Sequence, residues 1–114
     1  MIEPGDVVTA YLPGVSATKR RPAVVISTPA YHSERPDVLL ALITSQVEKA
    51  ETSFDTPLYA WQQTRLQLPS TMRSFLFTKP AQEVIKIGHL TDADWSDVQA
   101  RLRHALAIPW PLLR

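Results

Sequence analysis

The chain has 114 residues, no cysteine, a formal net charge of +1, and 45% hydrophobic and 20% charged residues. This length and composition predict one globular domain, residues 1–114, with a modest core. The lack of cysteine excludes disulfides and a thiol nucleophile, and no apolar run approaches the roughly 20 residues that span a bilayer. We therefore expect a cytoplasmic protein without a membrane segment. His32, His89 and His104 have no ligand-like spacing, so we expect no metal and no cofactor.

Short apolar runs bounded by turn residues predict a series of strands. A helical turn is expected at Pro29 to Ser33, and the mixed stretch from Trp61 to Leu68 stays unassigned. The predicted strands are Val7 to Leu12, Ala23 to Ser27, Val38 to Thr44, Phe75 to Thr78 and Val84 to Ile87, with Phe54 to Tyr59 as a weaker candidate because Pro57 interrupts it.

The pattern changes to a helical period near the end of the chain, where we expect a helix from Asp92 to Ala107. Thr91 is a suitable N-cap, with Asp94 three residues later as an acidic variant of the capping box. One apolar face is formed at spacings of three and four by Trp95, Val98, Leu102 and Leu106.

Five to seven short strands followed by one amphipathic helix predict a β-rich, α+β fold. The strands follow one another without alternating helices, which favours a compact, partly closed β-barrel or a strongly curved sheet over a doubly wound parallel sheet. The tail from Ile108 to Arg114 is apolar, and we expect it to pack on the body of the protein or on a second subunit.

Basic residues and hydroxyls meet the ends of two predicted strands. Lys19, Arg20 and Arg21 run through Pro22 into one strand, and Thr44 and Ser45 close another. Guanidinium groups bind phosphate bidentately and stabilise charge that grows in a transition state. The pattern predicts a phosphate site; a plain basic loop between hairpin strands is the alternative.

The acids are unevenly distributed along the chain. None occurs between Asp6 and Glu34 or between Asp55 and Glu83. If these two stretches meet in the fold, they form one cationic face suited to a polyanion; a solvated basic face without a partner is the alternative. The stretches hold half of the 12 basic residues, namely Lys19, Arg20, Arg21, Arg65, Arg73 and Lys79.

Several motifs in order resemble the MazF/PemK toxins of bacterial toxin–antitoxin modules. The motifs are Gly5-Asp6-Val7-Val8, Arg20-Arg21-Pro22-Ala23-Val24-Val25-Ile26-Ser27, Ile43-Thr44-Ser45, Pro69-Ser70-Thr71-Met72-Arg73 with Phe77-Thr78, and Ile87-Gly88-His89-Leu90-Thr91. The resemblance implies a small SH3-like β-barrel with a terminal helix, and a homodimer. It also implies a metal-independent, sequence-selective endoribonuclease that cleaves single-stranded RNA and arrests growth. A cognate antitoxin would inhibit it by lying along the RNA groove.

The resemblance carries over catalytic roles to Arg21 and Thr44. Two departures accompany it: the loop from Pro13 to Lys19 lacks the acidic residue that many members carry, and Thr78 stands where some relatives have an aspartate. An acid/base role assigned to the loop residue therefore has no bearer in this chain.

The mechanism expected for such an enzyme is attack of the RNA 2′-OH on the adjacent phosphorus, giving a 2′,3′-cyclic phosphate and a 5′-OH. Arg21 would stabilise the charge on phosphorus, and Thr44 would bind the phosphate or the 2′-OH. His32 is a weak candidate for the proton acceptor, and Tyr59 and Trp61 are candidates for base stacking, with core packing favoured for Trp61. The predicted RNA-binding residues are Lys19, Arg20, Ser45, Ser70, Arg73 and Thr78.

Two other functions remain open at this point. The same barrel could bind RNA, or a protein such as a topoisomerase, without cutting anything. A scaffold domain whose basic face serves dimer contacts is the third reading.

Overall fold

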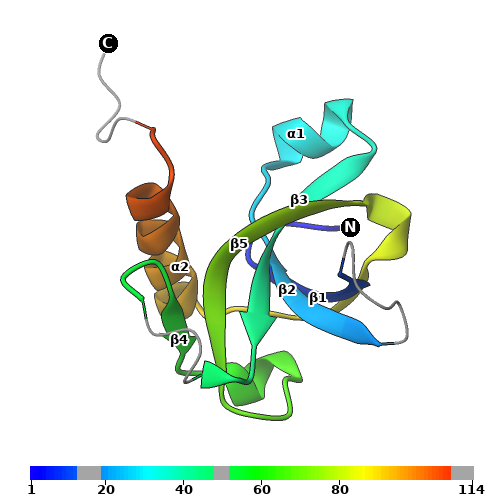
Figure 1. Cartoon of the computed structure of the whole chain (residues 1–114). Helices are drawn as coiled ribbons and strands as arrows, with labels where there is room; N and C mark the ends of the chain where they lie inside the picture. The colour runs from blue at the N-terminus through cyan, green and yellow to red at the C-terminus, as the bar shows by residue number, and fades with distance from the viewer. Residues whose placement is uncertain (13–18, 48–51, 109–114) are drawn as a thin grey trace.

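The computed structural model describes residues 1–12, 19–47 and 52–108. Its strands form one antiparallel sheet in the order β4-β5-β3-β2-β1-β6 (Figure 1). The strands are β1 (Asp6–Tyr11), β2 (Arg20–Val25), β3 (Asp37–Thr44), β4 (Thr56–Leu58), β5 (Ser70–Pro80) and β6 (Ile85–His89). The helices are α1 (Pro29–Glu34) and α2 (Asp92–Ala105), with short 3-10 helices η2 (Trp61–Thr64) and η3 (Ala81–Glu83).

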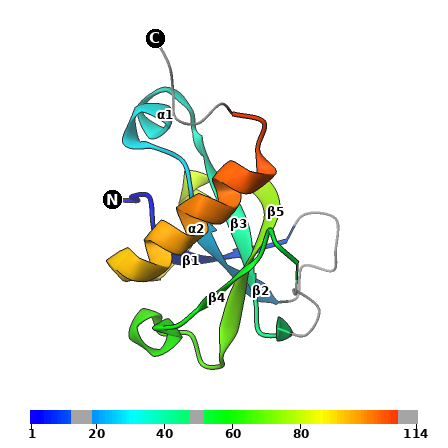
Figure 2. The same cartoon turned by 90° about the vertical axis from the view of Figure 1, so that its left-hand side faces the viewer.

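The sheet curls into a half-barrel and buries a different apolar cluster on each face. Side chains of successive strand residues point to opposite faces, so Val7 packs under α2 while Val8 packs inside the curl. In Figure 2 helix α2 lies across the sheet, where Val98 and Leu102 join the first cluster. The second cluster is enclosed by the curl and includes Leu40. Alternating apolar residues in these strands therefore form two cores, one on each face.

The predicted fold class is confirmed: six strands curl into one antiparallel sheet and a C-terminal helix follows. Strand β5 is longer than predicted, because it begins at Ser70 rather than Phe75 and runs to Pro80. Its early part was hidden by an irregularity in its pairing with β3, where the register shifts between Ala41 and Ile43. Such a bulge breaks the two-residue period on which the prediction rests.

Helix α2 begins as predicted and ends two residues earlier. The hydroxyl of Thr91 accepts a hydrogen bond from the amide of Asp94 (3.3 Å), which caps the first turn. The carboxylate of Asp94 does not complete a capping box. It is buried, and it accepts hydrogen bonds from the backbone amides of Tyr59 (3.0 Å) and Ala60 (2.9 Å). The helix start thereby fixes the chain between β4 and η2. At the other end, Leu106 adopts an extended conformation.

A buried carboxylate joins the two strands at one edge of the sheet. Asp6 is fully buried; its Oδ1 contacts Nδ1 of His89 (2.7 Å) and Nζ of Lys86 (3.2 Å), and its Oδ2 accepts from the amide of Glu3 (2.8 Å). We call these four residues the Asp6 cluster. Burial raises the pKa of Asp6, but the hydrogen bonds from His89, Glu3 and Lys86 outweigh burial and leave the pKa below its ordinary value.

Two sequence-based expectations fall on residues that the structure does not describe. The loop 13–18, with its missing acid, and the tail 109–114 lie outside the described residues. Among the helices that are described, none is both long and apolar enough to cross a bilayer.

Candidate functional site

The candidate site lies where the ladder between β2 and β3 stops. The amide of Ile26 donates to the carbonyl of Leu39 (3.0 Å). Along an antiparallel ladder every second residue donates to the same neighbouring strand. Pro22 lies four residues before Ile26, at a position that should therefore donate to β3. Proline has no N–H. The last pair between the two strands is accordingly Ala23 with Leu42. Beyond it β3 continues alone against β5, so a gap opens beside Pro22.

This gap holds a cleft of about 340 Å³, which we call the β2–β3 cleft. Extending the β2–β3 register by two residues sets Arg21 opposite Thr44, on the same side of the sheet. Both residues line the cleft, and their shared role in binding phosphate stays a prediction. The lining residues are Lys19, Arg20, Arg21, Pro22, Ile43, Thr44, Ser45, Gln46, Leu66, Gln67, Leu68 and Ser70.

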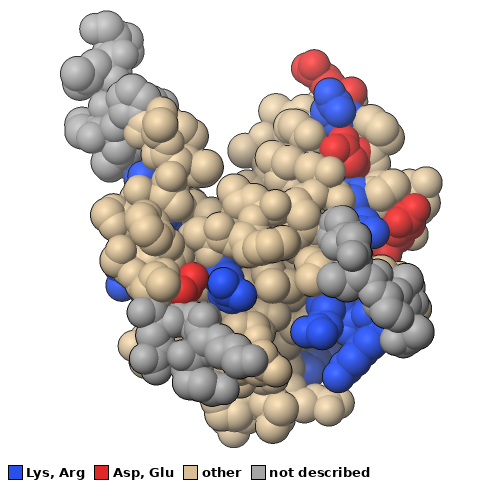
Figure 3. All heavy atoms as spheres, in the orientation of Figure 1, with Lys and Arg blue, Asp and Glu red and all other residues tan. Residues whose placement is uncertain are grey.

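All charged residues among the described lining of the β2–β3 cleft are positive. Its described lining residues include three cations, Lys19, Arg20 and Arg21, and no carboxylate. Lys and Arg atoms gather at the lower right of Figure 3, where Figure 1 places the start of β2. The two acid-free stretches meet here, since Ser70 comes from the second of them. However, Arg65, Arg73 and Lys79 are not among the lining residues, so the second stretch adds polar and apolar groups rather than charge.

The two arginines of the motif differ in their contacts with the protein. Arg20 donates through Nε to Oγ1 of Thr9 (3.0 Å) and through Nη2 to the carbonyls of Thr9 and Glu83, the latter at 2.8 Å. Its guanidinium also lies over the Tyr11 ring, 5.1 Å from the centroid. Arg21 is exposed and makes no hydrogen bond or ion pair with the described residues. The guanidinium that remains available to a ligand is that of Arg21.

Two hydroxyls of the cleft are oriented by the backbone. The amide of Gln46 donates to Oγ1 of Thr44 (3.1 Å), so the hydroxyl hydrogen of Thr44 is left to donate to a ligand. Ser70 instead donates its hydroxyl to the carbonyl of Leu68 (2.8 Å) and is largely buried. Thr44 can thus act as a donor to an anion, whereas Ser70 shapes the loop that precedes β5.

Two predicted RNA-binding residues lie outside the β2–β3 cleft. Arg73 lines a separate depression with Phe54 and Phe75, close to the end of α2. Thr78 pairs with Leu39 in the second half of β5, whereas Ser70 is the first residue of that strand. Their predicted role remains a prediction, and it requires RNA that extends beyond the cleft.

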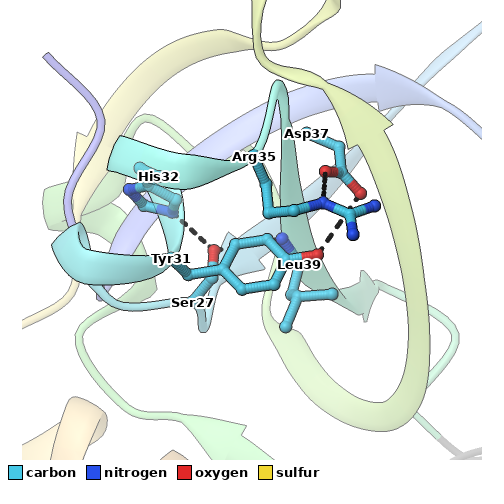
Figure 4. Close-up of polar contacts among 6 residues, drawn as sticks. All are labelled: Ser27, Tyr31, His32, Arg35, Asp37 and Leu39. Atoms are coloured by element: carbon cyan, nitrogen blue, oxygen red, sulfur yellow. Dashed lines mark hydrogen bonds and ion pairs between the residues drawn. The ribbon is translucent and has the colours of Figure 1, made fainter.

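His32, a weak candidate for the proton acceptor, lies away from the β2–β3 cleft, on α1. Its Nε2 contacts Oγ of the buried Ser27 (2.5 Å), which also accepts from the amide of Leu39 (3.0 Å) (Figure 4). Nearby, Arg35 pairs with Asp37 (3.5 Å). These contacts hold α1 against the sheet, so His32 is placed for a structural role.

The aromatic candidates for stacking border the β2–β3 cleft. Tyr59 is 77% exposed and lines an adjoining depression with Trp61 and Ser70, and Ser70 lines the cleft as well. Trp61 is half-buried and packs on the core cluster beneath α2. Tyr59 is therefore the more available of the two rings.

The sequence pattern gave no role to Leu66, Gln67 and Leu68, which lie in the stretch left unassigned. The only signal for them was their position just before the Pro69-Ser70 motif. No group of three or more His, Asp or Glu side chains suited to a metal ion occurs within residues 1–12, 19–47 and 52–108.

Comparisons with solved structures agree with this architecture. An endoribonuclease from a mycobacterial species, solved with its cognate antitoxin, superposes with a TM-score of 0.78 at 18% identity over 97% of this chain and 100% of that chain. A chain of the MazE–MazF complex from Deinococcus radiodurans gives 0.72 at 18% identity over 94% and 96%. The Mycobacterium tuberculosis toxin MazF-mt6 gives 0.72 at 21% identity over 92% and 99%.

No curated protein sequence is a significant match to this chain. A family model described as PemK-like, MazF-like toxin of type II toxin–antitoxin systems matches residues 3–106, nearly the whole chain. With the half-barrel, its terminal helix and the Arg-Pro strand all present, the chain belongs to the PemK-like, MazF-like toxins of type II toxin–antitoxin systems.

Proposed function

We propose that this toxin is a metal-independent endoribonuclease that cleaves single-stranded RNA at selected sequences. The observation that carries the proposal is the convergence of Arg21 and Thr44 on one cationic cleft without carboxylates among its described lining residues. In this proposal the protein works in the cytoplasm as a homodimer and is inhibited by a cognate antitoxin. Support for the antitoxin comes from the mycobacterial endoribonuclease and the MazF of D. radiodurans, which were solved with theirs.

In the proposed reaction the RNA supplies its own nucleophile. The 2′-oxygen forms a bond to phosphorus and the bond from phosphorus to the 5′-oxygen breaks, giving a 2′,3′-cyclic phosphate and a 5′-OH. The guanidinium of Arg21 donates to the phosphoryl oxygens as negative charge grows on them. Thr44 donates its available hydroxyl hydrogen to the same phosphate, because its oxygen already accepts from the Gln46 amide.

The described lining residues of the cleft are poor proton acceptors. Arginine keeps its proton under ordinary conditions and is a poor base, and the described lining residues include neither a carboxylate nor a histidine. Among the described lining residues, then, none is placed to take the 2′ proton, so in this proposal water would accept it and would supply a proton to the 5′-oxygen. Catalysis would come from charge stabilisation and in-line positioning of the 2′-OH.

The lack of a carboxylate or histidine among the described lining residues of the cleft favours a second candidate function. A module that binds RNA, or a protein such as a topoisomerase, needs the cations of the cleft but no proton acceptor. The two candidates differ in whether the RNA backbone is broken after binding.

One experiment separates them. The purified protein is incubated with a long unstructured transcript in EDTA, and the 5′ ends of the products are mapped. The proposal expects defined cleavage sites with 5′-OH and cyclic phosphate ends, and loss of cleavage in folded Arg21→Ala and Thr44→Ala variants. Binding of intact RNA by the wild-type protein would favour the binding module, and cleavage that requires added metal would contradict the mechanism.

A further inference from the structure

The β2–β3 cleft has two unlike walls. One wall, from the start of β2, carries the cations Lys19, Arg20 and Arg21. The other comes from the loop between η2 and β5 and presents one amide between two leucines, Leu66, Gln67 and Leu68. A nucleotide has the same asymmetry, since its phosphate is anionic and its base has an apolar face with polar edges. RNA whose phosphate bound the basic wall would have the amide wall available to its base.

The loop that carries the amide wall is fixed at both ends. At its start, the hydroxyl of the buried Thr64 donates to the carbonyl of Trp61 (2.7 Å), and Arg65 turns the chain with a positive φ of 62°. A Cβ at Gly88 would lie 2.9 Å from the Thr64 backbone, so only glycine permits this close approach of β6. At its end, Ser70 donates to the carbonyl of Leu68 (2.8 Å).

Within the loop, packing decides which side chain faces the ligand. Leu66 is partly buried and packs on the core cluster beneath α2. Gln67 is exposed, and its side-chain amide makes no hydrogen bond with the described residues. Leu68 is 58% exposed. The amide and the exposed leucine are both available to a ligand in the cleft.

We propose that Gln67 is a specificity-determining residue that reads the base next to the scissile phosphate, with Leu68 contacting the face of that base. The inference rests on the proposed endoribonuclease function. A glutamine amide offers a donor and an acceptor side by side and so distinguishes base edges, whereas a cation or a hydroxyl alone binds phosphate without regard to sequence. The fixed loop holds the backbone that carries this amide in place before RNA binds, which reduces the ordering cost of recognition.

The test compares cleavage preferences on an RNA pool randomised around the cleavage site. Gln67→Leu removes the hydrogen bonds at similar size, and Gln67→Glu removes the donor. The matched control is Gln62→Leu, since Gln62 is an exposed glutamine of η2 that does not line the cleft. We expect both Gln67 variants to change the preference at one flanking position by about tenfold while other positions and the control stay as in wild type.

The outcomes separate this inference from the proposed function. An unchanged cleavage map, or a uniform slowing at all sites, would overturn the role of Gln67 while leaving the endoribonuclease intact. If the wild-type protein binds short oligoribonucleotides without cutting them, their affinities decide: a base preference that Gln67→Leu abolishes supports the inference, and one that it keeps overturns it. Absence of any RNA binding would overturn both.

Discussion

The β2–β3 cleft and the Asp6 cluster use charged residues in opposite ways. In the Asp6 cluster a buried carboxylate meets His89, Lys86 and a backbone amide, so its charge is fully paired within the protein. In the cleft the guanidinium of Arg21 has no protein partner among the described residues, and the ladder beside it is interrupted by Pro22. Paired charge stabilises the fold, and unpaired charge is left for a ligand. The comparison predicts which substitutions affect stability and which affect activity.

The largest effect is expected for Arg21→Ala. Loss of one well-aimed donor to a charged transition state lowers the rate about 10²–10³-fold. The side chain is exposed, so the free energy of unfolding should change by no more than about 0.5 kcal/mol. Single-turnover cleavage and thermal unfolding measure the two quantities, and Arg35→Ala, just after α1 and outside the cleft, is the control for cleavage. A large loss of stability in Arg21→Ala would break the comparison.

Asp6→Asn should show the reverse pattern. Removing the charge from a buried, hydrogen-bonded carboxylate weakens its contacts with His89 and Lys86, and we expect a loss of about 2 kcal/mol in the free energy of unfolding. Below its lowered Tm the variant should cleave RNA like wild type. Denaturant unfolding is the measurement, and Asp97→Asn on the exposed side of α2 is the matched control. A stable but inactive Asp6→Asn protein would contradict the division of roles.

Pro22→Ala tests the origin of the cleft. Alanine supplies an N–H that can donate to the carbonyl of Ile43, which adds about 1 kcal/mol, while loss of the proline restriction in the unfolded chain removes about 0.4–1 kcal/mol. Stability should therefore stay close to wild type. Cleavage should fall about tenfold because Arg21 and Thr44 lose their spacing. Hydrogen exchange should show a protected amide at residue 22, and a fast-exchanging amide there would refute this account.

The smallest effect is the pH dependence of stability from Asp6. Its pKa is lowered in the folded state, so its contribution is complete above the pKa of the unfolded chain, about 3.9. It is lost as the pH falls below that value and through the folded pKa. Unfolding free energies measured from pH 6 down to pH 3 should fall less steeply in Asp6→Asn than in wild type. Equal slopes for the two proteins would show that Asp6 does not contribute to the loss of stability in acid.

The positions of Arg21 and Thr44 at strand ends could be predicted from the sequence, because both lie at the ends of unambiguous apolar runs. Helix α2 is predictable for a similar reason: its cap and its period are local signals. The catalytic roles, the homodimer and the RNA-binding role of Thr78 are not decided by these signals and remain predictions.

The features that could not be predicted from the sequence depend on contacts between residues far apart in the chain. Arg20 binds the carbonyl of Glu83, which is 63 residues away, so no local pattern separates it from Arg21. The start of β5 was missed because the bulge near Arg73 disturbs the alternation. Gln67 lies in a loop with no period at all, and only its neighbours in space give it a role.

Gly88 lies on the edge strand β6. Because it has no side chain, this strand can approach the backbone at Thr64, just before the loop that lines the cleft. A methyl group at Gly88 would press on the backbone at Thr64, and the chain beyond that point carries Gln67. A mutation screen for altered RNA targets would therefore be expected to select changes at position 88, although this residue does not line the cleft.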